Sequence, residues 1–244
     1  MRTRVILLIL VFLTSASCSP RTFEGGRPIL LFNGAGTSPN DVRAIESILK
    51  NNKLSYSTVD SQQLNGASES QLLNSQLLII PGGNFIEMGR GLSPEATAKV
   101  RSAVDRGLNY LGICAGAILA GHRDDKSLNL TSGVKFDFYN DVNRGVHKNV
   151  VAIVTAHGEN LDQYWEDGPQ LNGWGTVVSK YPDGSSATVQ GALGHGWVIL
   201  CGFHPEAPDS WRRGMEFGTP VSSSNAYALS IIEAALDHRE LPHY

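Results

Sequence analysis

The 244-residue sequence predicts an α/β domain with a mostly parallel central sheet, helices on both faces and a partly antiparallel extension. Three observations predict this fold. The run Leu77–Ile80 is apolar at every position, as in a parallel strand that is covered on both faces. Before Gly121, strand and helix patterns alternate, which is the order of a parallel sheet with crossover helices. Beyond Gly121, short strand patterns follow one another with Gly, Asn and Asp turns between them, which indicates antiparallel pairing.

The first half of the chain carries the parallel pattern. Its predicted strands are Pro28–Phe32, Tyr56–Val59, Leu77–Ile80 and Leu108–Ile113. Between them, Asp41–Leu49 has apolar residues at helical spacing, with Ser38 or Asn40 as the capping residue. A second helix begins at Ser93-Pro94-Glu95, because serine caps helices and proline is tolerated in the first turn, and it ends at Gly107.

The second half carries shorter strand patterns and one long helix. The predicted strands are Val150–Thr155, Thr176–Lys180, Ala187–Gln190 and Trp197–Leu200. The final helix spans about residues 225–237, with Ala228, Ile231, Ile232 and Ala235 on one side.

Composition narrows the class of function. The chain is 41% hydrophobic and 18% charged, which is typical of a globular protein. A formal net charge of −3 argues against nucleic-acid binding, because no surplus of basic residues is present to neutralise phosphates. The cysteines at positions 18, 114 and 201 lack zinc-ligand spacing, and Gly34-Ala35-Gly36 lacks the third glycine of a dinucleotide-binding turn. We therefore expect neither a metal nor a cofactor.

The N-terminus has the order of a secretory signal. Arg2 and Arg4 precede the apolar run Val5–Leu13, which is followed by small residues up to Cys18. Residues 1–17 are expected to be removed, either by a signal peptidase that cuts after small residues or by lipoprotein processing, which would leave a lipidated Cys18. We favour the lipoprotein over plain cleavage and over a buried N-terminal strand. Residues 18–27 then form a tether, residues 28–244 form the domain, and the protein is periplasmic or anchored to a membrane.

A cysteine lies between a buried strand and a helix of small residues. Gly112-Ile113-Cys114-Ala115-Gly116 is the cysteine version of the nucleophile elbow, a strained strand-to-helix turn. Side chains at Gly112 and Gly116 would collide with neighbouring backbone, and the helix N-terminus favours the reactive thiolate. Cys114 is therefore a candidate nucleophile; the alternative is a buried structural cysteine.

Two loops that follow apolar strands are candidates for the rest of a site. Gly202-Phe203-His204-Pro205-Glu206 supplies a general base, His204, and a carboxylate, Glu206, that can orient the imidazole; such a segment by itself is usually a surface turn. The loop Pro81-Gly82-Gly83-Asn84 lets a ligand approach the backbone, or is a simple strand exit. His157 and Cys201 are more simply interpreted as a strand-end residue and a core thiol, although Cys201 could also take part in redox chemistry.

The order of the Pro-Gly-Gly loop, the cysteine elbow and His-Pro-Glu resembles the class I glutamine amidotransferase superfamily. The segments that narrow the resemblance are LLFNGAGTSPNDV, LLIIPGGNF, VDRGLNYLGICAGAILAG, YWEDGPQL and WVILCGFHPEAP. Together they are similar to the N-terminal domain of eukaryotic biotin–protein ligases, which also occurs as stand-alone bacterial proteins. The resemblance extends from about residue 27 to about residue 208.

The resemblance implies a flavodoxin-like three-layer sandwich with a Cys114-His204-Glu206 triad. It also implies an oxyanion site at Gly82 and Gly83, with backbone amides of Gly83 or Asn84 and of Ala115 as donors. Tyr164 and Trp165 match a family segment that borders the pocket; aromatic core residues are the alternative. The sequence shows no biotin-ligase catalytic domain, so the resemblance does not imply biotinylation. It also shows no synthase domain that would accept ammonia, so glutaminase activity is implied only by analogy with the superfamily.

Three functions are compatible with these residues. The first is a cysteine hydrolase that cleaves a C–N bond of an exported small-molecule or peptide-like amide. The second is a binding or regulatory module that retains the geometry of the triad without turnover. The third is a redox or electrophile-handling cysteine protein, as in the DJ-1-like relatives of this fold. Membrane contact is expected through the lipid on Cys18.

Overall fold

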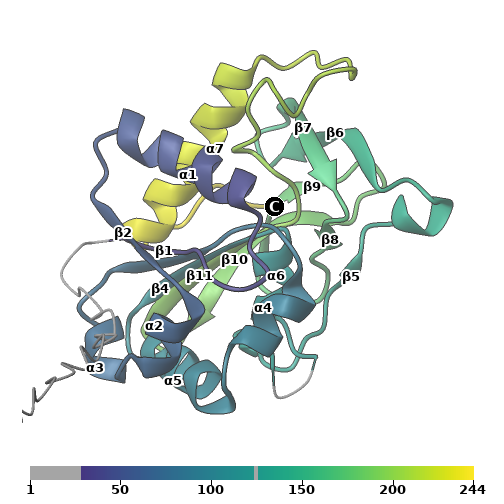
Figure 1. Ribbon diagram of the computed structural model, residues 1–244. Helices are drawn as coiled ribbons and strands as arrows, with labels where there is room; N and C mark the ends of the chain where they lie inside the picture. Colours follow the sequence, from purple (N-terminus) through teal and green to yellow (C-terminus); the bar gives the residue numbers. More distant parts are fainter. Residues whose placement is uncertain (1–28, 124–125) are drawn as a thin grey trace, which may run out of the picture.

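The computed structural model describes residues 29–123 and 126–244, and it confirms the predicted α/β fold. Within these residues, nine strands form one sheet in the order β2-β1-β3-β4-β11-β10-β9-β6-β7 (Figure 1). The predictions for a signal, a tether and a lipidated Cys18 fall on residues 1–28 and lie outside the described residues.

The parallel half of the sheet contains the five strands β2, β1, β3, β4 and β11. Their bounds are β1 (Ile29–Phe32), β2 (Tyr56–Val59), β3 (Leu77–Ile80), β4 (Asn109–Ile113) and β11 (Gly196–Cys201). All positions of β1, β3 and β4 are buried, as the continuous apolar runs predict.

The antiparallel half extends the same sheet from β11. Its strands are β10 (Ser186–Leu193), β9 (Thr176–Lys180), β6 (Lys148–Thr155) and β7 (Asn160–Glu166). A separate two-stranded sheet pairs β5 (Asp137–Phe138) with β8 (Pro169–Gln170), and a short 3₁₀ turn, η1 (Val142–Arg144), precedes β6.

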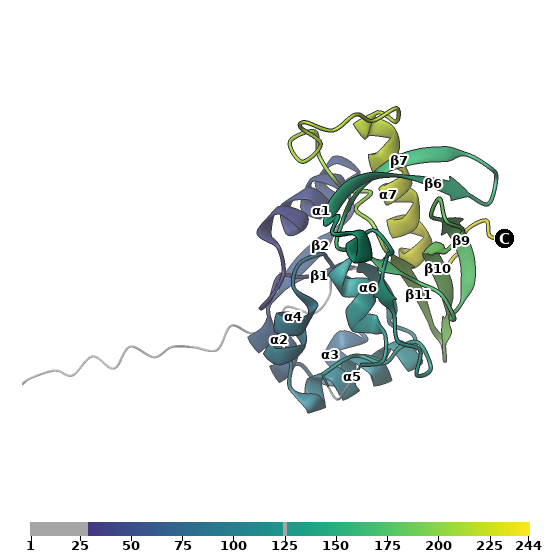
Figure 2. The ribbon, with the colours of Figure 1, turned by 90° about the vertical axis from the view of Figure 1, so that its right-hand side faces the viewer.

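Helices cover both faces of the sheet, and the alternation of side chains along the strands separates two cores. Leu77 and Ile79 belong to the core under α1 (Pro39–Asn51) and α7 (Val221–Leu236). Leu78 and Ile80 belong to the core on the opposite face. Figure 2 shows the helices on that face, which are α2 (Ser61–Gly66), α3 (Glu69–Leu72), α4 (Phe85–Gly91), α5 (Pro94–Asp105) and α6 (Ala115–Ala120).

Helix capping follows the local sequence. Ser38, not Asn40, caps α1, and its hydroxyl accepts a hydrogen bond from the Asp41 amide at 3.4 Å. Ser93 caps α5 through the amide of Ala96 at 3.1 Å, with Pro94 in the first turn. In the part of the chain that the structure describes, no helix has the length and apolar character needed to cross a membrane.

Candidate functional site

Cys114 forms the sharp turn between β4 and α6. Its backbone angles are φ 49° and ψ −107°, and a positive φ is rare for any residue other than glycine. Backbone strain of this kind persists where the surrounding structure holds it, and it is common at functional sites. The Cys114 amide donates to the Cys201 carbonyl at 2.8 Å, and the Cys114 thiol contacts the Glu166 carbonyl at 3.5 Å.

Two glycines make this turn possible, as the sequence predicts. A Cβ atom at Gly112 would lie 2.6 Å from the carbonyl oxygen of Gly116. A Cβ atom at Gly116 would overlap the carbonyl oxygen of Ile80 in the neighbouring strand β3. In both cases the obstacle is backbone, which cannot rotate away as a flexible side chain can.

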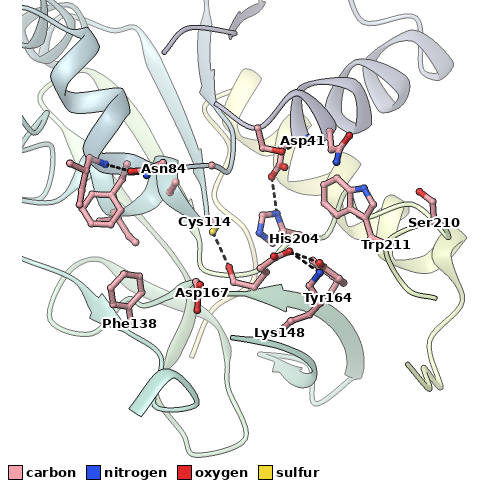
Figure 3. Close-up of a pocket in the computed structure, with 18 of the residues that line it drawn as sticks. Asp41, Asn84, Cys114, Phe138, Lys148, Tyr164, Asp167, His204, Ser210 and Trp211 are labelled. Atoms are coloured by element: carbon pink, nitrogen blue, oxygen red, sulfur yellow. Dashed lines mark hydrogen bonds and ion pairs between the residues drawn. The ribbon is translucent and has the colours of Figure 1, made fainter. Parts of the chain in front are cut away.

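His204 lies beyond the end of β11 and contacts two carboxylates through one ring nitrogen. Figure 3 shows one of these contacts, between Asp41 and His204. The distance from His204 Nδ1 is 3.0 Å to Glu206 Oε1 and 3.1 Å to Asp41 Oδ1. Asp41 and His204 are each 5% exposed and Glu206 is 2% exposed. The His204 amide donates to the Tyr164 carbonyl at 2.9 Å, which attaches the turn to β7.

Burial and neighbouring charges shift the pKa values of His204, Asp41 and Glu206. For His204, burial lowers the pKa, but the charges of Cys114, Glu206 and Asp41 outweigh it and hold the pKa well above its usual value. For Asp41, burial raises the pKa, and the charge and hydrogen bonding of His204 reverse the shift, so that the pKa is lowered. Burial prevails at Glu206 and raises its pKa.

The sequence predicts an oxyanion site in the Pro81–Asn84 loop, and Gly82, Gly83 and Asn84 differ in how they relate to it. The Asn84 amide donates to the Gly36 carbonyl at 2.7 Å, and the Asn84 side chain caps α4. Asn84 is therefore not a free oxyanion donor, and that expectation is corrected. Gly83 and Ala115 line the pocket; the described residues provide no acceptor for the Gly83 amide, and Ala115 is the first residue of α6, where amides have no partner within the helix. Gly82 has no side chain, and this leaves space for the side chains of Asp41 and His204.

Cys114, His204 and Gly83 share a cavity of about 800 Å³ that is open to solvent. Its wall combines aromatic, apolar and charged side chains. The aromatic members are Phe85, Phe138, Tyr164 and Trp211, and the charged members besides Asp41 and His204 are Lys148, Glu166, Asp167 and Arg213. The Tyr164 ring packs edge-on against His204 at a centroid distance of 5.8 Å (Figure 3).

Trp165 does not line this cavity, which corrects the prediction made for it. Adjacent residues of a strand face opposite sides, so Tyr164 and Trp165 of β7 cannot both face the site. Trp165 is fully buried, packs edge-on against Tyr139 at 5.7 Å and donates to the Gly168 carbonyl at 3.3 Å. The alternative interpretation of Trp165, an aromatic core residue, is the one observed.

The two remaining candidates from the sequence are a core residue, Cys201, and a surface residue, His157. Cys201 is fully buried in the core, and burial raises the pKa of its thiol to about 12. His157 is exposed in the turn after β6.

Asp41 and Trp211 were not predicted from the sequence. Trp211 lies in the segment between β11 and α7, where no periodicity marks it. Asp41 did carry a signal: it occupies the buried stripe of α1 together with Ala44, Ile45 and Ile48. An acidic residue on such a stripe indicates a buried partner.

Asp41, His204 and Glu206 also form a possible metal-binding group. Among the described residues, these three have potential ligand atoms that all lie within 4.8 Å of one another. Ligands of a tetrahedral zinc ion would be about 3.4 Å apart, given metal–ligand distances of about 2.0–2.2 Å. The observed separations of 3.0 and 3.1 Å are those of hydrogen bonds and ion pairs. At these distances both carboxylates interact directly with His204.

Comparison with known proteins agrees with this architecture. The family model described as "Biotin-protein ligase, N terminal" matches residues 27–153. A biotin–protein ligase of Schizosaccharomyces pombe (strain 972 / ATCC 24843) is 26% identical over 210 residues, which are 73% of this chain and 33% of that protein. This chain thus spans about a third of the length of that relative.

Solved structures with the same fold include glutamine amidotransferases. One has a TM-score of 0.62 at 18% identity, over 85% of this chain and 98% of the other. A second, from Thermotoga maritima, has a TM-score of 0.55 at 14% identity, over 86% of this chain and 97% of the other. An exo-β-1,4-mannosidase of Opitutaceae bacterium strain TAV5 matches at a TM-score of 0.55 and 15% identity, over 86% of this chain and 36% of the other. At these identities the likeness shows the fold.

Proposed function

This chain belongs to the biotin–protein ligase N-terminal family, and from that premise we propose that it is a cysteine-nucleophile hydrolase of amide C–N bonds. The observation that carries the proposal is the placement of Cys114, at positive φ on a glycine-flanked elbow, in the same cavity wall as His204. In the proposed triad, Cys114 attacks, His204 transfers the proton and Glu206 orients the imidazole. The ligase activity belongs to the name of the yeast relative, of which this chain spans about a third, and it is not part of the proposal.

The proposed reaction uses the free ring nitrogen of His204. Because the carboxylates occupy Nδ1, Nε2 is left to take the Cys114 proton. The thiolate attacks the amide carbonyl carbon, and the amides of Gly83 and Ala115 stabilise the oxyanion. His204 then protonates the leaving amine, the C–N bond breaks and a thioester remains. A water molecule that gives its proton to His204 hydrolyses the thioester, which releases the acid and restores the thiol.

The test of this proposal is the pair Cys114→Ala and Cys201→Ala, assayed by alkylation with iodoacetamide and by hydrolysis of a panel of peptide and amino-sugar amides. We expect the wild type and Cys201→Ala to be labelled at Cys114, located by peptide mass spectrometry, and to hydrolyse at least one amide. Cys114→Ala is expected to lose all hydrolysis, because the buried Cys201 thiol cannot replace it.

Three results would redirect the proposal. Hydrolysis that persists in Cys114→Ala would contradict the assignment of the nucleophile. Strong labelling of Cys114 without hydrolysis of any amide would favour the ligand-binding module. Reversible oxidation of Cys114, detected with a sulfenic-acid probe, would favour the redox alternative.

We further propose that the protein is exported and acts on its substrate outside the cytoplasm. Support comes from the order of arginines, apolar run and small residues before Cys18. When the full chain is expressed in a bacterium with a lipoprotein pathway, we expect it to sediment with membranes and Cys18→Ser to be released from them. Equal distribution of both proteins between the fractions would contradict lipidation, and accumulation of an uncut full-length chain in the cytoplasm would contradict export.

A further inference from the structure

His204 has two acidic neighbours, whereas a Cys-His-Glu triad requires one. Glu206 Oε1 forms a hydrogen bond with His204 Nδ1 at 3.0 Å. Asp41 Oδ1 lies 3.1 Å from the same nitrogen as an ion-pair contact, and it has no hydrogen-bond donor within the described residues. A buried carboxylate oxygen that lacks a hydrogen bond is costly unless a positive charge compensates it. The positive charge that acts on Asp41 is that of His204.

The fold brings Asp41 to this place through two local features. Ser38 caps α1, so the Asp41 side chain in the first turn is held over the carboxyl ends of the parallel strands. Gly82 then leaves the space that Asp41 needs. A Cβ atom at Gly82 would overlap Asp41 Oδ1 and would lie 2.6 Å from His204 Cε1. The glycine loop is therefore shaped around the Asp41–His204 pair as well as around the pocket.

We propose that Asp41 is a second positioning residue, which shares the Nδ1 proton of His204 with Glu206 so that either carboxylate alone keeps Nε2 directed at Cys114. The inference rests on the proposed roles of Cys114 and His204. It differs from a plain triad in its consequence: loss of Glu206 alone is expected to be partly compensated. The two acids also have different characters, since the pKa is lowered at Asp41 and raised at Glu206.

The titratable groups on the elements that pack around His204 determine the pKa of its imidazole. Cys114 faces it from the elbow, Asp41 from α1, Glu206 from its own turn and Tyr164 from β7. Burial and Glu166 raise the pKa of Tyr164 to about 12, so its phenol remains neutral near pH 7. Cys201, whose pKa burial raises to about 12, also stays neutral. Cys114, Asp41 and Glu206 are left to set the charge around the imidazole.

The test compares Asp41→Asn, Glu206→Gln and the double variant by two readouts that need no turnover. One is the rate of Cys114 alkylation by iodoacetamide across pH; the other is the NMR titration of the His204 imidazole. Removal of an opposite charge disfavours the imidazolium, so each single variant should move the His204 midpoint to lower pH. We expect alkylation at pH 7 to fall about tenfold or less in each single variant and about a hundredfold in the double variant.

Glu46→Gln is the matched control, because it neutralises an acid of the same helix that pairs with Lys50 away from the site. Melting temperatures identify any variant that is not folded, and Asp41→Ser provides a second neutral replacement. The inference is overturned if Asp41→Asn and Asp41→Ser behave like Glu46→Gln in both readouts, or if the double variant is no worse than Glu206→Gln. Absence of amide hydrolysis in every protein would count against the hydrolase alone, since neither readout depends on it.

Discussion

His204→Ala is expected to lower the rate of Cys114 alkylation at pH 7 by about a hundredfold, because activated cysteines owe their thiolate to a neighbouring cation. Removing the imidazole also leaves the carboxylates of Asp41 and Glu206, which contact it in the native protein, facing the thiol without a positive charge between them. Like charges disfavour the thiolate, so the change removes an attraction and exposes a repulsion. The measurement is the second-order rate constant for iodoacetamide at Cys114, followed by mass spectrometry.

His157→Ala is the control for that variant, since His157 is exposed in the turn after β6. It should leave the alkylation rate unchanged within error. A rate for His204→Ala close to that of the wild type, in a folded protein, would mean that the elbow alone activates Cys114. The helix N-terminus at Ala115 would then be the remaining source of activation.

The parallel half of the fold could be predicted from sequence because each strand is a short, uninterrupted apolar run. The predicted bounds of β2, β3 and β9 match the structure, and those of β4, β10 and β11 differ by a few residues at their ends. β7 was missed because Asn160–Glu166 mixes polar and aromatic residues and gains its strand form from pairing with β6. The helices α2, α3 and α4 have four to seven residues, too few to show a periodic pattern.

The predictions for the candidate site were likewise correct where local sequence decides the position of a residue, and wrong where contacts distant in the sequence decide it. Local sequence located Cys114 and His204, because an elbow and a strand exit each place a side chain at the carboxyl edge of the sheet. Two errors concern information that is not local. The Asn84 amide is taken by Gly36, a residue 48 positions away in the chain, and the side of β7 on which Trp165 lies depends on how that strand meets the sheet. Asp41 was missed because it reaches His204 from a different element.

Gly116→Ala is expected to destabilise the protein by about 3 kcal/mol, the upper range for overpacking a well-filled interior. Alanine would normally favour a helical position over glycine by about 1 kcal/mol, so a net loss must come from the collision with the Ile80 carbonyl. Relief of that collision requires α6 to move away from β3, and Cys114 would move with it. The free energy of unfolding in urea and the alkylation rate should therefore fall together.

Gly66→Ala separates this collision from the general effect of adding a methyl group. Gly66 is the last residue of α2, and a Cβ atom there would meet nothing within 4 Å. We expect its stability to be unchanged or raised by up to about 1 kcal/mol, because alanine reduces the freedom of the unfolded chain. If Gly116→Ala behaves like Gly66→Ala, the elbow has more room than the structure describes. If stability falls while alkylation is unchanged, the close contact of α6 with β3 serves packing alone, and the strained Cys114 turn does not depend on it.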